Sequence, residues 1–263
     1  MIARSPRKRF GQHFLRDRAV ARRIVSAFAP GADDNVVEIG PGDGVLTREL
    51  APRVATLHAL EIDRDLATAL AHEFAEYANV VIHNADALEF ELARVAKGEY
   101  GLRLIGNLPY NISTPLLFHL LQQARCIRDM CFMLQKEVVD RLAALPGSKA
   151  YGRLGVMVQW RCRVQRLFAV GRGAFRPTPQ VDSAVVRLEP YRTPPVMIAD
   201  EGHFAAVVSA AFATRRKMLR NALADILSEA DMRSVGIDPS RRGETLNLRE
   251  FAALANAITT AST

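Results

Sequence analysis

Cysteine is scarce in this 263-residue chain, and long apolar runs are missing from it altogether. The three cysteines, Cys126, Cys131 and Cys162, form no CxxC pair, so the sequence supports neither a disulfide framework nor a zinc site. No apolar run approaches the roughly 18 residues that span a bilayer, and no apolar signal-peptide segment follows the basic N-terminus. We therefore expect a protein of the reducing cytoplasm, with no membrane partner.

Acidic residues are scarce in three arginine-rich stretches. The formal net charge is +7, and residues 1–23 alone carry eight basic side chains and a single acid. Residues 151–176 contain six arginines and no acid, and a third cluster comprises Arg215, Arg216 and Lys217 with Arg220. Separated basic clusters favour a polyanion, because phosphate contacts are additive and independent of sequence. A solvated basic face is the alternative, and an organellar transit peptide is a further one for the N-terminus.

Apolar runs that alternate with helical patterns predict an α/β fold. With 49% hydrophobic and 24% charged residues, the chain has the composition of a globular protein. From residue 35 to 145 the alternation is typical of crossover units on a parallel sheet. Residues 156–170 and 183–190 resemble two long strands, which we expect to form an antiparallel hairpin that completes the sheet. A proline-rich linker at 190–195 precedes helical patterns at 204–223 and 248–258. We therefore predict an α/β domain over 1–191 and a small all-α domain over 192–263.

A glycine-rich turn, EIGPGDG at 38–44, follows the first apolar run. Gly40, Gly42 and Gly44 permit positive φ at a strand-to-helix turn and let a ligand approach bare backbone. The dinucleotide fingerprint G-x-G-x-x-G does not fit, because Val45 occupies its sixth position. The turn therefore predicts a site for another nucleoside-containing ligand, with a purely structural turn as the alternative.

Two acids end the next two predicted strands. Glu61 can accept hydrogen bonds from both ribose hydroxyls of a nucleoside, and Asp86 can accept one from an adenine amine. With the glycine turn, this arrangement resembles that of the S-adenosylmethionine-dependent methyltransferases. Considered singly, Glu61 and Asp63 could be a helix cap and a solvated acid, and Asp86 could cap a helix that begins near Ala87.

Asn107, Leu108, Pro109 and Tyr110 follow the fourth predicted strand. They resemble the (N/D/S)-(I/L/P)-P-(Y/F/W/H) motif of methyltransferases that act on planar amino groups. An adenine amine is a poor nucleophile, because its lone pair is delocalised into the ring. Acceptance of its hydrogens by Asn107 and by the carbonyl of Leu108 or Pro109 would favour a tetrahedral nitrogen, while Tyr110 would stack on the purine. The alternative is a proline turn with a core tyrosine.

Longer motifs narrow the resemblance to one family. They are KRFGQHFL at 8–15, IGNLPYNIS at 105–113, FRPTPQVDS at 175–183, a run at 204–221 that contains RRKMLRN, and RGETLNLREFAAL at 242–254. Together they cover nearly the whole chain, which resembles the ribosomal RNA small-subunit adenine N6,N6-dimethyltransferases (the KsgA/RsmA and Dim-type family). The resemblance implies a Rossmann-like methyltransferase sheet with a small helical C-terminal domain.

The resemblance also implies roles for individual residues. The implied contacts to S-adenosylmethionine come from Gln12, His13, Leu15, Gly40, Gly42, Glu61, Asp86 and Asn107. Asparagine is commoner at the position of His13, so a backbone contact is the safer expectation there. Phe175 would form a second aromatic wall opposite Tyr110, so that the target adenine is sandwiched; a buried loop anchor is the alternative.

The implied substrate is a pair of adjacent adenosines in a hairpin loop near the 3′ end of small-subunit (16S) ribosomal RNA, within an immature small subunit. Loop bases can be unstacked at less cost than bases in a duplex. Two rivals remain: a large-subunit ribosomal RNA dimethyltransferase of the macrolide-resistance type, and a non-catalytic assembly factor with the same fold. FRPTPQVDS and RRKMLRN favour the small-subunit enzyme. We expect a monomer. We also expect no metal, because no carboxylate or cysteine lies at ligand spacing from His58, His72 or His83.

Overall fold

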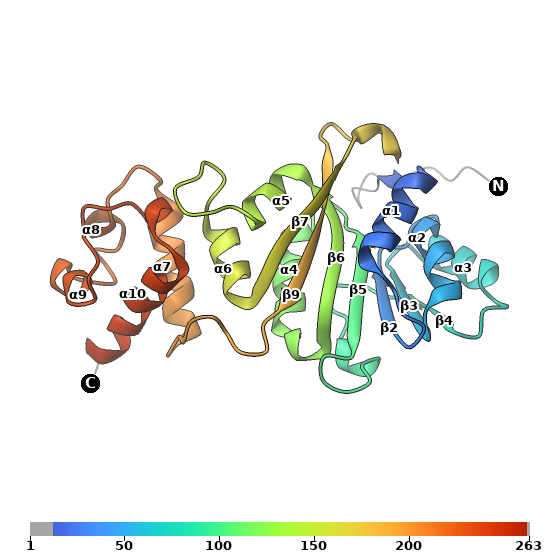
Figure 1. Cartoon of the computed structure of the whole chain (residues 1–263), viewed down its shortest axis with the longest axis horizontal. Coiled ribbons are helices and arrows are strands. Elements are labelled where there is room, and N and C mark those ends of the chain that lie inside the picture. The colour runs from blue at the N-terminus through green and yellow to red at the C-terminus, as the bar shows by residue number, and fades with distance from the viewer. Residues whose placement is uncertain (1–12, 262–263) are drawn as a thin grey trace. The chain divides into compact units, whose positions relative to one another are not determined.

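The structure is a computed structural model that describes residues 13–261, with side chains described as far as residue 258. Contacts between residues divide the chain into two compact units. The first unit comprises Met1–Val139 and Arg163–Pro190, and the second comprises Asp140–Cys162 and Tyr191–Thr263. Residues 140–162 thus group with the helical unit. The sequence analysis placed them in the domain 1–191, and that domain boundary stays a prediction. Figure 1 shows the elements of both units.

A seven-stranded sheet forms the centre of the first unit (Figure 1). Its order is β4 (Val80–Asn84), β3 (Thr56–Glu61), β2 (Asn35–Ile39), β5 (Leu102–Asn107), β6 (Ile127–Gln135), β9 (Ser183–Pro190) and β7 (Cys162–Val170). The strands from β4 to β6 are parallel, and β9 runs antiparallel to β6. All five residues of β2 are buried, as expected for a parallel strand covered on both faces. The predicted α/β fold is confirmed.

Helices α1 (Arg18–Phe28), α2 (Val45–Leu50) and α3 (Arg64–Glu73) pack their apolar side chains against the sheet, and α4 (Ser113–Gln122) follows β5. Asp17 caps α1, because its Oδ1 accepts hydrogen bonds from the backbone N–H groups of Ala19 and Val20. Ile24 and Phe28 of α1 are fully buried in this core. The cap and the buried face together fix the helix that follows the N-terminal motif.

A two-stranded sheet joins the N-terminal motif to a distant segment. Strand β1 (Phe14–Leu15) pairs antiparallel with β8 (Phe175–Arg176), which follows the short 3₁₀ turn Arg172–Ala174. Arg16 extends the pairing by donating its backbone N–H to the carbonyl of Ala174 at 2.8 Å. Residues more than 150 positions apart in sequence are therefore held side by side.

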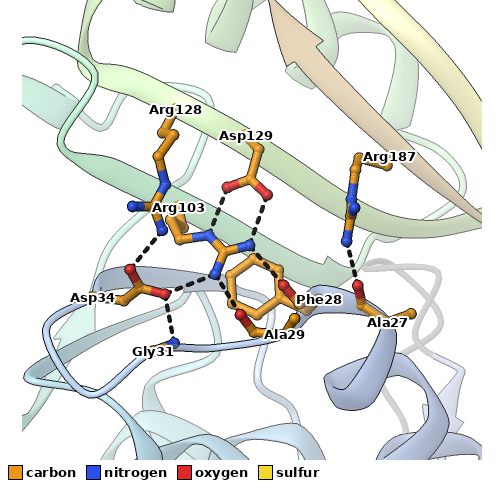
Figure 2. Close-up of polar contacts among 9 residues, drawn as sticks. All are labelled: Ala27, Phe28, Ala29, Gly31, Asp34, Arg103, Arg128, Asp129 and Arg187. Atoms are coloured by element: carbon orange, nitrogen blue, oxygen red, sulfur yellow. Dashed lines mark hydrogen bonds and ion pairs between the residues drawn. The ribbon is translucent and has the colours of Figure 1, made fainter.

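A buried arginine, Arg103, connects the amino-terminal ends of neighbouring strands to the carboxyl end of α1 (Figure 2). Arg103, on β5, donates to both carboxylate oxygens of Asp129 at 2.7 and 2.8 Å and to Asp34 at 2.7 Å. It also donates to the carbonyls of Phe28 and Ala29, which a helix end leaves without intrahelical partners. All five donor contacts of the guanidinium thus lie within the protein, and its carbon lies 4.1 Å from the centre of the Phe28 ring.

The second unit has a helical core of its own. Helices α6 (Arg153–Arg161), α7 (Glu201–Ala213), α8 (Leu219–Ala222), α9 (Glu229–Ser234) and α10 (Leu248–Ala261) supply its buried side chains, and α5 (Lys136–Leu142) leads the chain into it. Tyr151 donates from its hydroxyl to the carbonyl of Leu246 at 2.9 Å, which closes this core around a buried phenol. No helix in the described part of the chain is long and apolar enough to cross a membrane.

Two sequence predictions about this unit are wrong. Residues 156–161, expected as part of a long strand, belong to helix α6, where Val156, Val158 and Trp160 are buried with strand-like spacing. Short apolar runs do not distinguish a strand from a buried helix, and packing decides between them. The helix expected over 204–223 ends at Ala213. Of the third basic cluster, Arg215, Arg216 and Lys217 lie in the turn before α8, and Arg220 lies in α8.

Candidate functional site

A pocket lies at the carboxyl ends of the parallel strands, where ligands of open α/β sheets bind. It is lined by the ends of β2, β3 and β5, by the turn after β4, and by His13 and Phe14 at the start of β1. The predicted residues that line it are His13, Gly40, Gly42, Glu61, Asp86, Asn107, Leu108, Pro109 and Tyr110. Gln12 lies outside the described residues. The structure therefore brings together residues that are spread over almost one hundred positions.

The glycine turn after β2 adopts the conformation that its sequence predicts. Gly40, Gly42 and Gly44 have φ values of +67°, +56° and +74°, which L side chains rarely adopt. A Cβ atom at Gly42 would lie only 2.8 Å from Cδ1 of Phe14. The glycine thus admits the Phe14 ring, which lines the pocket and was not among the predicted residues.

Glu61 ends β3 as a buried carboxylate with two backbone partners. Its oxygens accept hydrogen bonds from the N–H groups of Gly42 at 3.1 Å and Asp63 at 2.9 Å. Burial raises the pKa of Glu61, although these N–H groups favour the charged form. The alternative that made Glu61 a helix cap and Asp63 a solvated acid is wrong, because Asp63 is the N-cap of α3. Both side chains are buried, at 4% exposed each.

Asp86 combines a local structural role with a place in the pocket. Its Oδ1 accepts a hydrogen bond from the N–H of Leu88 at 2.8 Å, which fixes the turn after β4. The pocket wall around it is apolar and includes Ile62, Ala85 and Ala87. Ile62 was not among the predicted site residues, and it is 45% exposed despite its apolar side chain. The sequence signal that could have identified it is its position directly after Glu61.

Asn107 ends β5 with its amide group fixed. Its Nδ2 donates to the backbone carbonyl of His13 at 2.8 Å. The neighbouring Leu108 is buried, and its N–H donates to the carbonyl of Met133 on β6. The carbonyl of Pro109 accepts from the N–H of Ile112 at 3.3 Å, so one of its lone pairs is already used. These hydrogen bonds to Met133 and from Ile112 therefore fix the backbone that follows β5.

Tyr110 is half-buried and bonded at its hydroxyl. The hydroxyl and Oγ of the fully buried Ser183 lie 2.7 Å apart and share a hydrogen bond. Burial raises the pKa of Tyr110, so the group is a neutral phenol near pH 7. The ring of His13 lies against that of Tyr110, with centroids 5.4 Å apart and an interplanar angle of 31°. The proline-turn alternative, which made Tyr110 a core residue, does not describe this arrangement.

Leu15 and Phe175 lie beside the pocket rather than in its wall. They are register partners in the β1–β8 pair, and both side chains belong to the hydrophobic core. Leu15 contributes to a smaller adjoining cavity together with Glu38 and Asn107. Phe175 is only 1% exposed, the position expected of a buried loop anchor. Its stacking role opposite Tyr110 stays a prediction.

Within residues 13–258, most side chains of the basic stretches are exposed, but several arginines have partners. Arg16 pairs with Asp43 at 2.8 Å, and the guanidinium carbon of Arg23 lies 3.9 Å from the centre of the Phe168 ring. In the second unit, Arg215 donates to Glu244 at 2.6 Å and to the carbonyl of Lys149 at 2.8 Å. Arg215, which belongs to the third basic cluster, therefore holds Glu244 and the backbone of Lys149. The sequence around Arg215 did not indicate this structural role.

Comparison with known proteins places the chain in a family. The model of the family described as ribosomal RNA adenine dimethylase matches residues 3–260. The chain belongs to this family. Among curated relatives, the ribosomal RNA small subunit methyltransferase A of Hahella chejuensis is 52% identical over 98% of this chain and 94% of its own length. The protein of the same name from Methylococcus capsulatus is 54% identical over 96% of this chain and 98% of its own.

Two solved structures share the fold. A dimethyladenosine transferase from Plasmodium falciparum has a TM-score of 0.80 at 22% identity, with 95% of this chain and 98% of that chain covered. The 23S rRNA methyltransferase ErmE has a TM-score of 0.72 at 27% identity, with coverages of 94% and 99%. The expected methyltransferase sheet is therefore confirmed, and identity is higher to the small-subunit relatives than to ErmE.

Proposed function

We propose that this dimethylase transfers methyl groups from S-adenosylmethionine to N6 of two adjacent adenosines in a hairpin loop near the 3′ end of 16S rRNA, during ribosome biogenesis. The observation that carries the proposal is the shared pocket at the strand ends, where the glycine turn, Glu61, Asp86 and the Asn107 amide meet. Relatives named as small-subunit methyltransferases, about half of whose residues are identical, support the choice of subunit.

The pocket fits a nucleoside-containing cofactor. Glu61 is a buried carboxylate with two N–H donors, and its remaining lone pairs can accept ribose hydroxyls. Ile62 and Ala87 offer apolar surface for an adenine ring, and Asp86 offers an acceptor for its amine. The bare backbone at Gly40, where a Cβ would lie 3.7 Å from the carbonyl oxygen of Asn107, leaves room beside the amino-acid portion. When bound, the cofactor supplies an electrophilic methyl group on a sulfonium.

Asn107 and Tyr110 account for the amine chemistry. The Oδ1 of Asn107 accepts one hydrogen of the substrate amine, and a backbone carbonyl accepts the other. Because Pro109 already accepts from Ile112, the geometry favours Leu108 for this second contact. Tyr110 stacks on the purine and holds it in the plane that these acceptors require. A monomethylated amine keeps one hydrogen and its lone pair, so the same groups serve the second transfer.

The exposed basic residues supply the RNA contacts. Arg18, Arg22 and Arg23 on α1, with Arg172 and Arg176 around β8, present positive charge on the unit that holds the pocket. Arg216 and Lys217 do so on the helical unit, which we propose as a ribosome-binding domain with a boundary near residue 191. We further propose that the protein acts as a cytoplasmic monomer on immature small subunits and needs no metal.

The test is methyl transfer from labelled S-adenosylmethionine to small subunits that lack the modification, with naked rRNA and large subunits in parallel. Mass-spectrometric mapping should find dimethyladenosine at two adjacent positions of the small-subunit hairpin. The Asn107→Ala variant is the matched control and should leave the RNA unlabelled. Label in large subunits would instead support a function like that named for ErmE, and binding without transfer would support an assembly factor.

A further inference from the structure

The amide of Asn107 has only one orientation that its surroundings allow. The atom of this side chain nearest the His13 carbonyl must be the NH2 group, because a backbone carbonyl can only accept a hydrogen bond. The amide oxygen, Oδ1, is thereby directed away from that carbonyl. Since Asn107 lines the pocket, its hydrogen-bond acceptor remains available there. The backbone of His13 therefore decides which end of the amide a substrate meets.

The ring of Tyr110 is held in a similar way, but from two sides. Ser183, the first residue of β9, is fully buried and bonds the Tyr110 hydroxyl at 2.7 Å, so the far end of the ring is fixed. The imidazole of His13 lies against the Tyr110 ring, with centroids 5.4 Å apart and an interplanar angle of 31°. At its backbone, the carbonyl of Tyr110 accepts a hydrogen bond from Ser113 Oγ at 3.1 Å.

His13 is in turn tied to the segment that leads to Ser183. Its Nδ1 lies 2.8 Å from the carbonyl oxygen of Pro177, so this nitrogen must carry the proton and donate it. Pro177 follows β8, whose residue Arg176 is the register partner of Phe14. His13 thus contacts Asn107, Tyr110 and Pro177 at once, through its carbonyl, its ring and its Nδ1–H.

We propose that His13 and Ser183 are positioning residues that hold the two reactive side chains of the NLPY motif in the geometry that methyl transfer requires. The proposal rests on the proposed function. Neither residue has to touch the adenine: Ser183 acts through Tyr110, and His13 acts through Asn107 and Tyr110. A base that stacks on a ring free to rotate would lose the alignment that the amide acceptor needs, because positioning accounts for much of the rate in such a reaction.

A double-mutant cycle tests Ser183. Tyr110→Phe and Ser183→Ala each remove one partner of the hydrogen bond while the stacking ring stays. Each should lower kcat on small subunits about two- to ten-fold, the range for one net hydrogen bond, without change in the affinity for S-adenosylhomocysteine measured by calorimetry. The double variant should be no slower than either single variant. Tyr77→Phe, at a tyrosine 44% exposed, is the matched control.

The same cycle applied to the free energy of unfolding gives a readout that needs no activity. Non-additive losses of stability would confirm the contact between the two hydroxyls. Losses of kcat that multiply in the double variant, or reduced cofactor affinity in Ser183→Ala, would overturn the positioning role. If the unfolding cycle shows coupling but wild-type protein transfers no methyl group, the proposed function has failed and the contact has not.

Two substitutions separate the roles of the His13 side chain. His13→Phe keeps a ring against Tyr110 but removes the donor to Pro177, and His13→Asn keeps a short donor but removes the ring. Both keep the backbone carbonyl that holds Asn107, so kcat should fall in each by less than in Asn107→Ala, at unchanged affinity for S-adenosylhomocysteine. Wild-type kcat in both variants would remove the side chain of His13 from the proposal.

Discussion

Replacement of Arg103 by methionine should destabilise the first unit strongly. The change leaves the buried carboxylate of Asp129, 7% exposed, without either of its guanidinium contacts, and it removes the donors to the carbonyls of Phe28 and Ala29 (Figure 2). Removal of one partner from a buried ion pair typically costs 3–5 kcal/mol, because the remaining charge is uncompensated. Asp34 keeps Arg128 at 2.5 Å, so we expect a loss of about 3 kcal/mol.

The dependence of this loss on pH identifies its cause. Burial opposes the charged form of Asp34, but hydrogen bonds from Gly31, Arg103 and Arg128 outweigh it and hold the pKa of this carboxyl below its usual value. An acid with a lowered pKa stabilises the fold at pH values above its unfolded pKa and loses that contribution as the pH falls through its folded pKa. In Arg103→Met the carboxyl of Asp34 loses the Arg103 hydrogen bond and is easier to protonate, so the difference between variant and wild type should shrink from pH 7 to pH 4.

Urea unfolding followed by circular dichroism at both pH values measures the effect, and a thermal scan at pH 7 should show a fall in Tm of about 10 °C. Arg94→Met is the matched control, because its pair with Glu91 is about 70% exposed on both sides and should contribute almost nothing. A loss below about 1 kcal/mol, or one independent of pH, would refute the account of an uncompensated buried charge.

Three further changes have expected outcomes at the site and on the surface. Burial raises the pKa of Glu38 to about 7. The stability associated with its neutral form is therefore present below its unfolded pKa and is lost as the pH rises through 7. In urea unfolding, the free energy of unfolding of Glu38→Gln should exceed that of wild type by up to about 3 kcal/mol at pH 8, and by much less at pH 5. Glu61→Ala should weaken calorimetric binding of S-adenosylhomocysteine by about 1.5–3 kcal/mol, and unchanged affinity would exclude the ribose contact. Substitution of Arg216 and Lys217 by glutamine should lower the salt dependence of subunit binding by up to about two units, whereas a flat response would leave these charges as a solvated face.

The sequence sufficed for the parallel sheet and for most of the pocket, because both depend on local signals. Short apolar runs with glycine or acidic ends mark strands and their carboxyl termini, and parallel strands place those termini on one edge. Glu61 and Asn107 could therefore be assigned to one site although 46 residues separate them. The strand predicted at 156–161 was wrong for the converse reason. Gly155 lets helix α6 approach the carbonyl of Arg141, where a Cβ would lie 2.6 Å away, and no local pattern indicates such a contact.

The contacts that orient the proposed catalytic motif were beyond sequence reasoning, because they connect segments that lie far apart in the sequence. His13 meets Asn107 across 94 positions and Pro177 across 164, and Ser183 meets Tyr110 across 73. A motif search finds these residues in three separate segments and gives no register between the segments. The register places a carbonyl of one segment against the amide of another, and an amide with one end so fixed presents a single acceptor to the pocket. The direction of that acceptor, and with it the capacity to take a hydrogen from an amine, is thus a property of the tertiary structure rather than of the NLPY sequence.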